Sequence, residues 1–363
     1  MAGITFTEAS GVNDSIFKDS QAPIRLFIEK RAEAFEQNSM LPKLFKMVNS
    51  RSWAEKYASM TAMDGFQPVG EMGKHPHDEM GMGFEKIIEH EVWKNRFSIS
   101  REIIDDGKLM DLEGRPGAFI AGYYRTREKY GAAMFGGAIQ GKNEVEFGGR
   151  KFNALGADGM PLFSSSHRWG GEYDSASASS YNNTHRDFAI YFGKNDMHGH
   201  RDTLNLFADA FSNDALMALE SKMQDVRDDK GNVLTVAPTT ILIPNDYQLK
   251  KEVFAAIGAD KDPATANNGF NYTYGRWNVI VWQYLNQYIT AGTKPWVLLD
   301  EQYNDEHAGA VFQDRVQLEV DSYIDKDTNA NVWDGYARFG AGFNDWRGYA
   351  VGGLSGGDTL IGA

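Results

Sequence analysis

The chain of 363 residues contains no cysteine, which excludes disulfide bonds and thiolate metal sites as sources of stability. It also has few basic residues, because 37 Lys and Arg stand against 50 Asp and Glu and give a formal net charge of −13. Proteins that grip duplex DNA through its phosphates carry clustered Lys and Arg, so this balance argues against tight DNA binding. No apolar run approaches the roughly 20 residues that span a bilayer, and the first residues lack a signal-peptide pattern. We therefore expect a protein made in the cytosol, without a membrane partner.

Aromatic residues, in contrast, are abundant: 22 Phe, 16 Tyr and 8 Trp make up 13% of the chain. Aromatic side chains fill large cores and are also enriched at protein interfaces, so composition alone leaves both interpretations open. The length exceeds that of a usual single domain. It predicts two packed units, or one body with extensions.

The stretch from Trp93 to Ile139 organises the rest of the chain. Its first part alternates, with Trp93, Phe97 and Ile99 on one parity and polar residues on the other. This period of two predicts a strand that has one buried and one solvated face. An acidic turn ends the strand.

A long helix is predicted after this turn. Pro116 stands where the first turn of a helix tolerates proline, and apolar residues recur at helical spacing from Phe119 until Gly136-Gly137. Such a helix would be a spine roughly 30 Å long. The side opposite its apolar face carries Arg125, Arg127, Glu128 and Lys129.

Residues 1–20 show no sustained period and predict an N-terminal arm. Helical spacing covers Ile24–Phe35 and returns over Leu41–Val48, which predicts two surface helices. Met63–Gly83 differs, because it holds five glycines and two prolines around a polar cluster. We expect a two-stranded arm with a mobile tip, entering from Phe66 and Val69 and returning along Ile87–Ile99; a disordered surface loop is the alternative.

The second half of the chain alternates strands and helices, which predicts an α/β middle unit. For the whole chain, including the strand and long helix of the first half, we expect the α+β class. A Ser-rich stretch at 170–184 is expected to be mobile. The tail from Gly335 is rich in glycine. The predicted elements are a hairpin at Phe147–Leu155, a helix carrying Leu216–Val226, strands at Val233–Val236 and Thr239–Ile243, a helix from Pro244 to Ile257, a central strand at Trp277–Trp282, a strand at Trp296–Leu299, and a half-exposed strand at Val316–Asp321.

Patterns typical of catalytic or metal sites occur but lack the context that such sites need. Gly353–Gly357 fits G-x-S-x-G, yet no helix and no downstream Asp or His can follow it. The loop cluster His75, His77, Asp78 and Glu79, and the pair His198 and His200, lack an element that would fix ligand geometry. We therefore predict no catalytic residue, cofactor or metal. An α/β hydrolytic enzyme that uses these clusters is the main alternative from another class.

The organising stretch also carries a resemblance. Phe97–Asp106 resembles the strand and turn before the spine helix in major capsid (major head) proteins of tailed bacteriophages, of the Mu-like type. Matching motifs follow in the family's order over most of the chain from about residue 90. They are Asp158–Phe163 with His167, Gly231–Ile243 running into Pro244, Pro295–Asp300, and Arg338–Trp346. The first hundred residues and the Ser-rich stretch depart from the pattern.

The resemblance implies the tailed-phage major capsid fold, shared with herpesvirus capsid floors and encapsulins. It implies a structural protein that is not an enzyme and that assembles into the icosahedral head of a tailed phage around double-stranded DNA. An encapsulin-like nanocompartment shell is the nearer alternative. The implied parts are an N-terminal arm (1–60), an extended loop (61–101), a peripheral domain with the spine helix (102–204), an axial domain (205–310), peripheral return strands (311–335) and an axial C-terminal segment (336–363).

The resemblance also implies partners. We expect hexamers and pentamers of this chain, together with portal, scaffolding and decoration proteins, in a virion assembled in the host cytoplasm. Some phage shells of this kind join a loop lysine to a neighbour, and Lys74 or Lys86 is available, although we expect non-covalent locking. The residues expected at inter-subunit contacts are Phe66, Lys74, His75, His77, Lys86, Trp93, Arg338 and Trp346.

Overall fold

The computed structural model describes residues 4–6, 15–60, 63, 66–77, 82–106, 109–165, 167, 204–227, 232–258, 271–357 and 359–360. The Ser-rich stretch, the pair His198 and His200, and the acidic residues Asp78 and Glu79 lie outside these ranges. Predictions for them therefore remain predictions.

The described strands are β1 (Thr5–Phe6), β2 (Lys46–Asn49), β3 (Ala54–Met60), β4 (Met82–Glu89), β5 (Glu91–Ile99), β6 (Glu144–Phe147), β7 (Arg150–Asn153), β8 (Thr240–Pro244), β9 (Asn278–Trp282), β10 (Trp296–Leu299), β11 (Ala310–Ile324), β12 (Asn331–Phe343) and β13 (Tyr349–Gly352). The described helices are α1 (Ser15–Gln37), α2 (Leu41–Leu44), α3 (Arg101–Asp105), α4 (Leu109–Ile139), α7 (Asn213–Gln224), α8 (Tyr247–Ile257) and α9 (Glu301–His307), with a 3-10 helix η1 (Gln283–Gln287).

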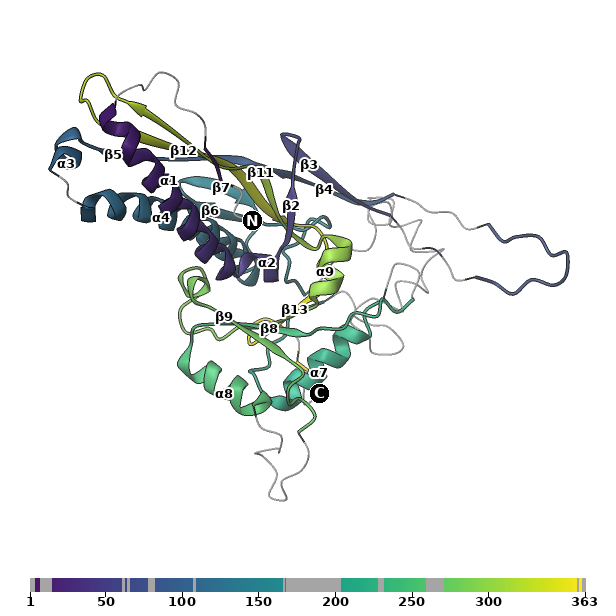
Figure 1. Cartoon of the computed structure of the whole chain (residues 1–363). Helices are drawn as coiled ribbons and strands as arrows, with labels where there is room; N and C mark the ends of the chain where they lie inside the picture. Colours follow the sequence, from purple (N-terminus) through teal and green to yellow (C-terminus); the bar gives the residue numbers. More distant parts are fainter. Residues whose placement is uncertain are drawn as a thin grey trace.

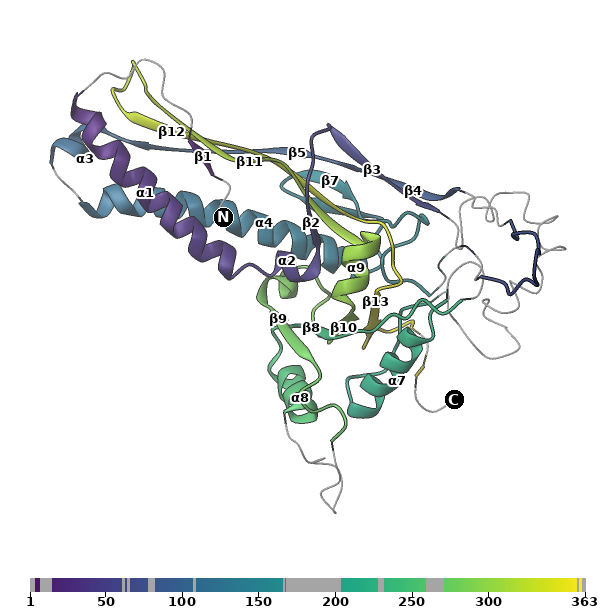
Figure 2. The same ribbon diagram turned by 45° about the vertical axis from the view of Figure 1, so that its right-hand side comes forward.

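Two units and one projection make up the molecule. The upper unit is a long twisted sheet with α1 and α4 side by side along one face, and the lower unit is a shorter sheet with α7 and α8 on the side away from the upper unit (Figure 1). The hairpin of β3 and β4 projects beyond the end of the long sheet (Figure 2). The mixture of long antiparallel strands with an α/β unit agrees with the predicted α+β class.

The long sheet has the strand order β1-β11-β12-β5, and β2 also pairs with β11. Strand β5 runs antiparallel to β12, which aligns Phe97 with Trp333 and Trp93 with Ala337. The predicted alternation in β5 is confirmed, because Trp93, Phe97 and Ile99 are half-buried or buried while the polar residues between them are exposed. Trp93 stacks on Phe339 with ring centroids 4.9 Å apart. The predicted boundary between residues 335 and 336 falls inside β12, which is continuous.

The spine helix is confirmed, but α4 is longer than predicted: its 31 residues begin at Leu109, so Pro116 lies inside the helix. At 1.5 Å per residue its length is about 45 Å. Gly136 and Gly137 do not end it. They allow close packing instead, since a Cβ on Gly136 would lie 2.5 Å from the Cβ of Tyr288, and one on Gly137 would overlap Val145.

The side of α4 that carries Arg125, Arg127, Glu128 and Lys129 is partly buried. Arg127 lies inside the subunit and bonds to Asp314 of β11. Glu128 accepts hydrogen bonds from the Trp282 indole (3.0 Å) and from the Ser39 hydroxyl (2.6 Å). These charged side chains tie the spine to its surroundings rather than facing water.

The second predicted N-terminal helix is wrong in its second half. Helix α2 ends at Leu44, and Lys46–Asn49 form β2, which runs parallel to β11 from Val311 to Asp314. The edge of β11 offers a ladder of backbone partners to Lys46–Asn49, and this tertiary pairing decides their conformation. Helix α1 covers the predicted Ile24–Phe35 helix and begins earlier, at Ser15.

The lower sheet has the order β13-β10-β8-β9 and is buried on both faces. One face joins the hydrophobic cluster of α4, and the other joins the cluster of α7 and α8. The predicted strands β8 and β10 and the predicted helix α8 are confirmed, with Asp246 capping α8 through a 2.8 Å bond from the Leu249 amide. Strand β9 lies at the sheet edge, which corrects its predicted central position. Val233–Val236 forms only an isolated bridge at Val233.

The predicted two-stranded arm exists, but its strands differ from those expected. Strand β3 pairs with β4, so the hairpin starts at Ala54 rather than at Phe66. The returning stretch divides at His90 into β4, which belongs to the arm, and β5, which belongs to the long sheet. The chain between β4 and β5, which we call the elbow of the arm, lies directly against β12. A Cβ at Gly340 of β12 would overlap the Glu89 carbonyl, so this close approach requires glycine at that position.

In the ranges that the structure describes, no helix is long and apolar enough to cross a membrane.

Candidate functional site

The tip of the arm exposes apolar side chains that its own subunit leaves uncovered. Phe66 and Met72 are fully exposed and Val69 is half-exposed. Lys74, His75 and His77 of the same segment are exposed as well. Burying a Phe or Met side chain is worth about 1.5–3 kcal/mol, so this segment has affinity for another apolar surface.

The root of the arm is held firmly against the body. The Tyr57 hydroxyl accepts a bond from the Gln313 side chain at 2.6 Å, and Ile88 packs with Val311 in a small apolar cluster. His90 Nδ1 lies 2.8 Å from the carbonyl oxygen of Trp53, which can only accept, so this ring nitrogen carries the hydrogen. These contacts join the outgoing and returning legs where both leave the long sheet.

Lys86 lies on the inner face of the same hairpin. Only 7% of its surface is exposed, and burial lowers the pKa of Lys86 to about 8, an effect that the charge of Asp158 partly opposes. Its predicted role at an inter-subunit contact stays a prediction. The Coulombic attraction between Lys86 and Asp158 links the arm to the polar junction that contains this carboxylate.

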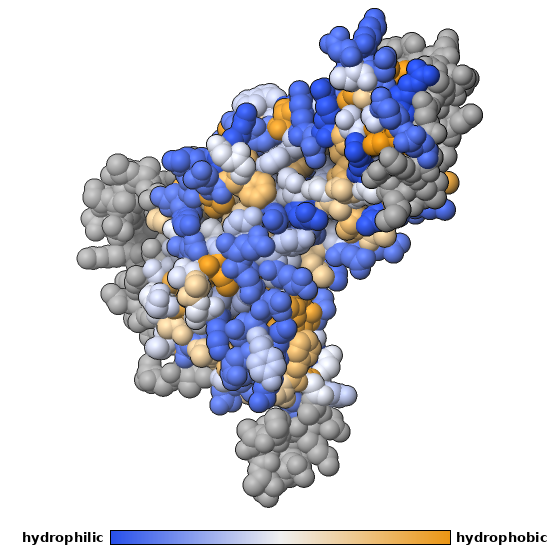
Figure 3. All heavy atoms as spheres, turned by 90° about the vertical axis from the view of Figure 1, so that its left-hand side faces the viewer, coloured by the Kyte–Doolittle hydropathy of each residue, from blue (hydrophilic) through white to orange (hydrophobic). Residues whose placement is uncertain are grey.

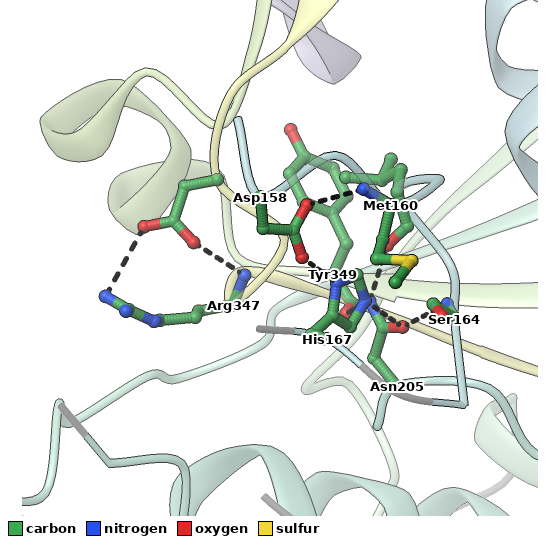
Figure 4. Close-up of polar contacts among 9 residues, drawn as sticks. Asp158, Met160, Ser164, His167, Asn205, Arg347 and Tyr349 are labelled. Carbon is green, nitrogen blue, oxygen red and sulfur yellow. Dashed lines mark hydrogen bonds and ion pairs between the residues drawn. The ribbon is translucent and has the colours of Figure 1, made fainter. Parts of the chain in front are cut away.

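That junction centres on His167, which has a fully buried side chain. His167 Nδ1 lies 2.6 Å from Asp158 Oδ2, and Nε2 lies 3.0 Å from Asn205 Oδ1 (Figure 4). The Asn205 amide nitrogen donates to the carbonyl oxygens of Leu162 and Tyr349, at 2.8 and 2.9 Å. Water is excluded, so each of these bonds has a low-dielectric setting.

The junction lies at the seam between the two units. Leu162 belongs to the hydrophobic cluster of the spine, whereas Leu204 and Phe207, which flank Asn205, belong to the cluster of α7 and α8. The backbone N–H of Asn205 also donates to the Ser164 carbonyl oxygen at 3.2 Å. Through its backbone and its side chain, this one residue fastens the loop after β7 to the lower unit.

Of the remaining residues expected at contacts, Trp346 is buried and Trp93 is half-buried. Trp93 packs on the spine side of the long sheet, and Trp346, 7% exposed, stacks on the His167 ring at 4.2 Å. Arg338 is half-buried on β12. Phe66, Lys74, His75 and His77 of the tip are exposed, and the predicted inter-subunit contacts of all these residues stay predictions.

The end of the molecule away from the arm presents a mixed surface. There the apolar side chains form scattered patches among polar ones (Figure 3). Tyr247 and Phe254, one helical face of α8, are exposed in the lower unit. Within the described part of the chain, the exposed large apolar side chains at the arm tip are Met63, Phe66, Val69 and Met72, which lie close together in sequence.

No three His, Asp or Glu side chains gather as metal ligands within the described ranges. Sequence reasoning missed the junction, because Asn205 lies 38 residues from His167 and 144 from Tyr349, and only tertiary structure joins them. The motif Asp158–Phe163 with His167 was noticed, but nothing in it points to Asn205. A buried His beside an Asp usually serves structure, and the full set of bonds here agrees with that role.

Comparison with known proteins places residues 177–352, just under half of the chain, in a match to a family described as phage capsid protein. No curated protein matches the chain. The family match supports a structural protein of a phage capsid shell rather than an enzyme.

Several solved structures are similar to the chain. One from Mycobacterium phage Patience has 13% identity and a TM-score of 0.47, covering 100% of this chain and 94% of that chain. The capsid of Myoviridae phage XM1 has 10% identity and a TM-score of 0.45, covering 87% and 92%. A virus-like particle from Pyrococcus furiosus has 7% identity and a TM-score of 0.42, covering 93% and 99%. With TM-scores below 0.5, these similarities carry no argument about function.

Proposed function

We propose that the chain is the major capsid subunit of a tailed phage, of the Mu-like head type, which assembles into an icosahedral head around double-stranded DNA. The observation that carries this proposal is the arm: its root is fixed to the body, while Phe66 and Met72 at its tip have no cover in their own subunit. Contacts with a neighbouring copy would offset the conformational entropy that such an arm loses when it becomes ordered. The family match supports the same class of protein.

The parts of the subunit suit a closed shell. Identical subunits close a shell through heterologous contacts around rotational axes, and hexamers and pentamers use the same surfaces at different angles. We assign residues 1–60 to an N-terminal arm, 61–101 to the extended loop, 102–204 and 311–335 to a peripheral domain, and 205–310 with 336–363 to an axial domain. A projecting hairpin on a rigid sheet adapts to both angles.

The charge of the chain fits enclosure of DNA without binding it. A net charge of −13 repels phosphates, so the shell would hold the genome by confinement and release it on opening. Portal, scaffolding and decoration proteins are the proposed partners, and the host cytoplasm is the proposed place of assembly. The proposed locking between subunits is non-covalent, since Lys86 is buried in its own subunit.

Removal of the arm tip tests the bridging role. Replacing residues 70–83 with a short Gly-Ser turn should leave α4 and the lower sheet folded, because neither takes core residues from the described part of this segment. Assembly should fail, since the arm is expected to contribute to an interface on the order of 1,000 Å². Wild-type shells of undiminished stability in negative-stain microscopy would refute the role.

A finer pair of variants separates folding from assembly. Phe66→Ser with Met72→Ser removes exposed side chains only, so the thermal midpoint of the subunit should stay unchanged while shells are lost. Ile88→Ser, at the buried root, should lower the midpoint and serve as the control for a folding defect. Equal loss of stability in both variants would contradict the assignment of the tip to an inter-subunit contact.

A further inference from the structure

Three polar side chains lie together inside the upper unit, at the end of the long sheet away from the arm (Figure 1). Ser322 of β11 lies directly opposite Trp333 of β12, and Asn331 stands two residues before Trp333. Residues directly opposite in an antiparallel ladder project from the same face, as do residues two apart on one strand. The three side chains therefore share one face, with neighbouring Cβ atoms about 4.5–7 Å apart.

This face of the sheet is the apolar one, which packs against the helices. Trp333 belongs to the hydrophobic cluster that contains Ile28 of α1 and Phe119 of α4. Asn331 and Trp333 have no exposed surface, and Ser322 has 1%. The polar groups are thus enclosed between the sheet and the two helices, where the bulk solvent does not reach them.

Four polar atoms of this group have no hydrogen-bonding partner in the described part of the chain. They are Ser322 Oγ, Asn331 Oδ1, Asn331 Nδ2 and Trp333 Nε1, and each is buried. The large majority of buried polar side-chain atoms in proteins bond either to the protein or to ordered water. An asparagine with both ends of its amide unpartnered, beside two further unpartnered groups, therefore indicates that a small polar molecule is bound there.

The chemistry of the three side chains selects the molecule. The Trp333 indole only donates, whereas the Ser322 hydroxyl and the Asn331 amide can each donate and accept. An anion would need donors alone, and a metal cation would need acceptors alone. Water donates twice and accepts twice, so it matches a mixed set, and with bonds of about 3 Å one water spans groups on neighbouring strand positions.

We propose that Asn331, Ser322 and Trp333 form a hydration site inside the upper unit, in which ordered water bridges the Asn331 amide to the Ser322 hydroxyl and the Trp333 indole. The water is a structural part of the subunit, because it satisfies polar groups of β11 and β12 beneath α1 and α4. A polar residue in this apolar layer then stabilises the fold instead of weakening it. The site does not depend on the proposed shell function.

An isosteric variant tests the site through the sign of its effect. In a hydrated site, Asn331→Leu removes the central partner and leaves Ser322 and Trp333 without their bridge, so the urea midpoint of unfolding should fall. In a dry site, leucine would replace an unsatisfied amide at nearly the same volume, and the midpoint should rise. Asn95→Leu, at an exposed position of β5, is the control for the greater strand preference of leucine.

Two further measurements complete the test. Ser322→Ala should also lower the midpoint, and the shift of the double variant should be smaller than the sum of the single shifts, because both side chains bond the same water. A structure of the wild-type protein at a resolution that shows ordered water should contain a density peak within about 3.2 Å of the Asn331 amide. This last measurement decides the matter should a variant fail to fold. A midpoint that rises more in Asn331→Leu than in Asn95→Leu, or a map without that peak, would overturn the hydration site.

Discussion

Arg127 of the spine helix holds Asp314 of β11 at two points, with Nη1–Oδ1 and Nη2–Oδ2 distances of 2.5 and 2.8 Å. Both side chains are about nine-tenths buried. The guanidinium carbon also lies 4.8 and 5.2 Å from the ring centroids of Phe312 and Phe339. The pair thus fixes the position of α4 on the long sheet, and it does so with full charges in a desolvated place.

Breaking this pair should be costly. Asp314→Asn leaves a buried guanidinium without its counter-charge and should lower the free energy of unfolding by about 3–5 kcal/mol. Asp334→Asn is the matched control, because Arg96 also holds Asp334 at two points, through Nε and Nη2, but at the surface, where an ion pair contributes little to stability. Urea unfolding measures the free energy of unfolding of both variants. Equal losses in the two would show that burial of the Arg127–Asp314 pair adds nothing to its contribution to stability.

Lys86 should make stability depend on alkaline pH. The pKa of Lys86 is lowered from 10.5 to about 8 in the folded chain, so the charged amine is disfavoured by folding. Below about pH 8 both states are charged and the full penalty applies. Between about pH 8 and 10.5 the folded state alone has lost the proton, so rising pH relieves the penalty.

Lys86→Met should accordingly raise the unfolding free energy at pH 7 by about 1–3 kcal/mol, with the gain shrinking toward about pH 10. Lys56→Met provides the control, since this lysine pairs with Glu85 on the exposed face of the same hairpin. Thermal melting at several pH values checks both. If the gain in unfolding free energy of Lys86→Met grew with pH, folding would not lower the pKa of Lys86.

Two glycines should respond in opposite directions to alanine. At Gly340 a Cβ would overlap the Glu89 carbonyl at the elbow of the arm, so Gly340→Ala should destabilise by about 2 kcal/mol or more. At Gly122 on α4 the nearest atom would be Asn95 Nδ2 at 3.9 Å, an ordinary contact. Gly122→Ala should stabilise the helix by about 0.5–1 kcal/mol. Equal effects in melting experiments would show that the elbow tolerates a side chain.

The sequence predicted elements whose signal is local. The alternation around Trp93 gave β5, helical spacing gave α4 and α8, and the continuous apolar run at Trp296–Leu299 gave β10. Each depends on residues that are neighbours along the chain. For these four elements, the residues that pack against them decide little beyond which face is buried.

What the sequence could not supply depends on partners far along the chain. Lys46–Asn49 are a strand only because the edge of β11 lies beside them, more than 260 residues later. Arg127 is identified as buried only once Asp314 is placed, and His167 gains its role only with Asn205. The exposed tip of the arm was predicted, because glycine and proline content is a local signal, but the start of its strands was not.

Assembly of this chain into a closed shell can be measured on the full-length protein expressed alone, by analytical ultracentrifugation and electron microscopy. We expect closed particles or hexameric and pentameric capsomers, which Phe66→Ser with Met72→Ser reduces to folded single subunits. A monodisperse monomer or dimer for the wild-type chain, unaffected by the arm variant, would show that the chain does not build a shell.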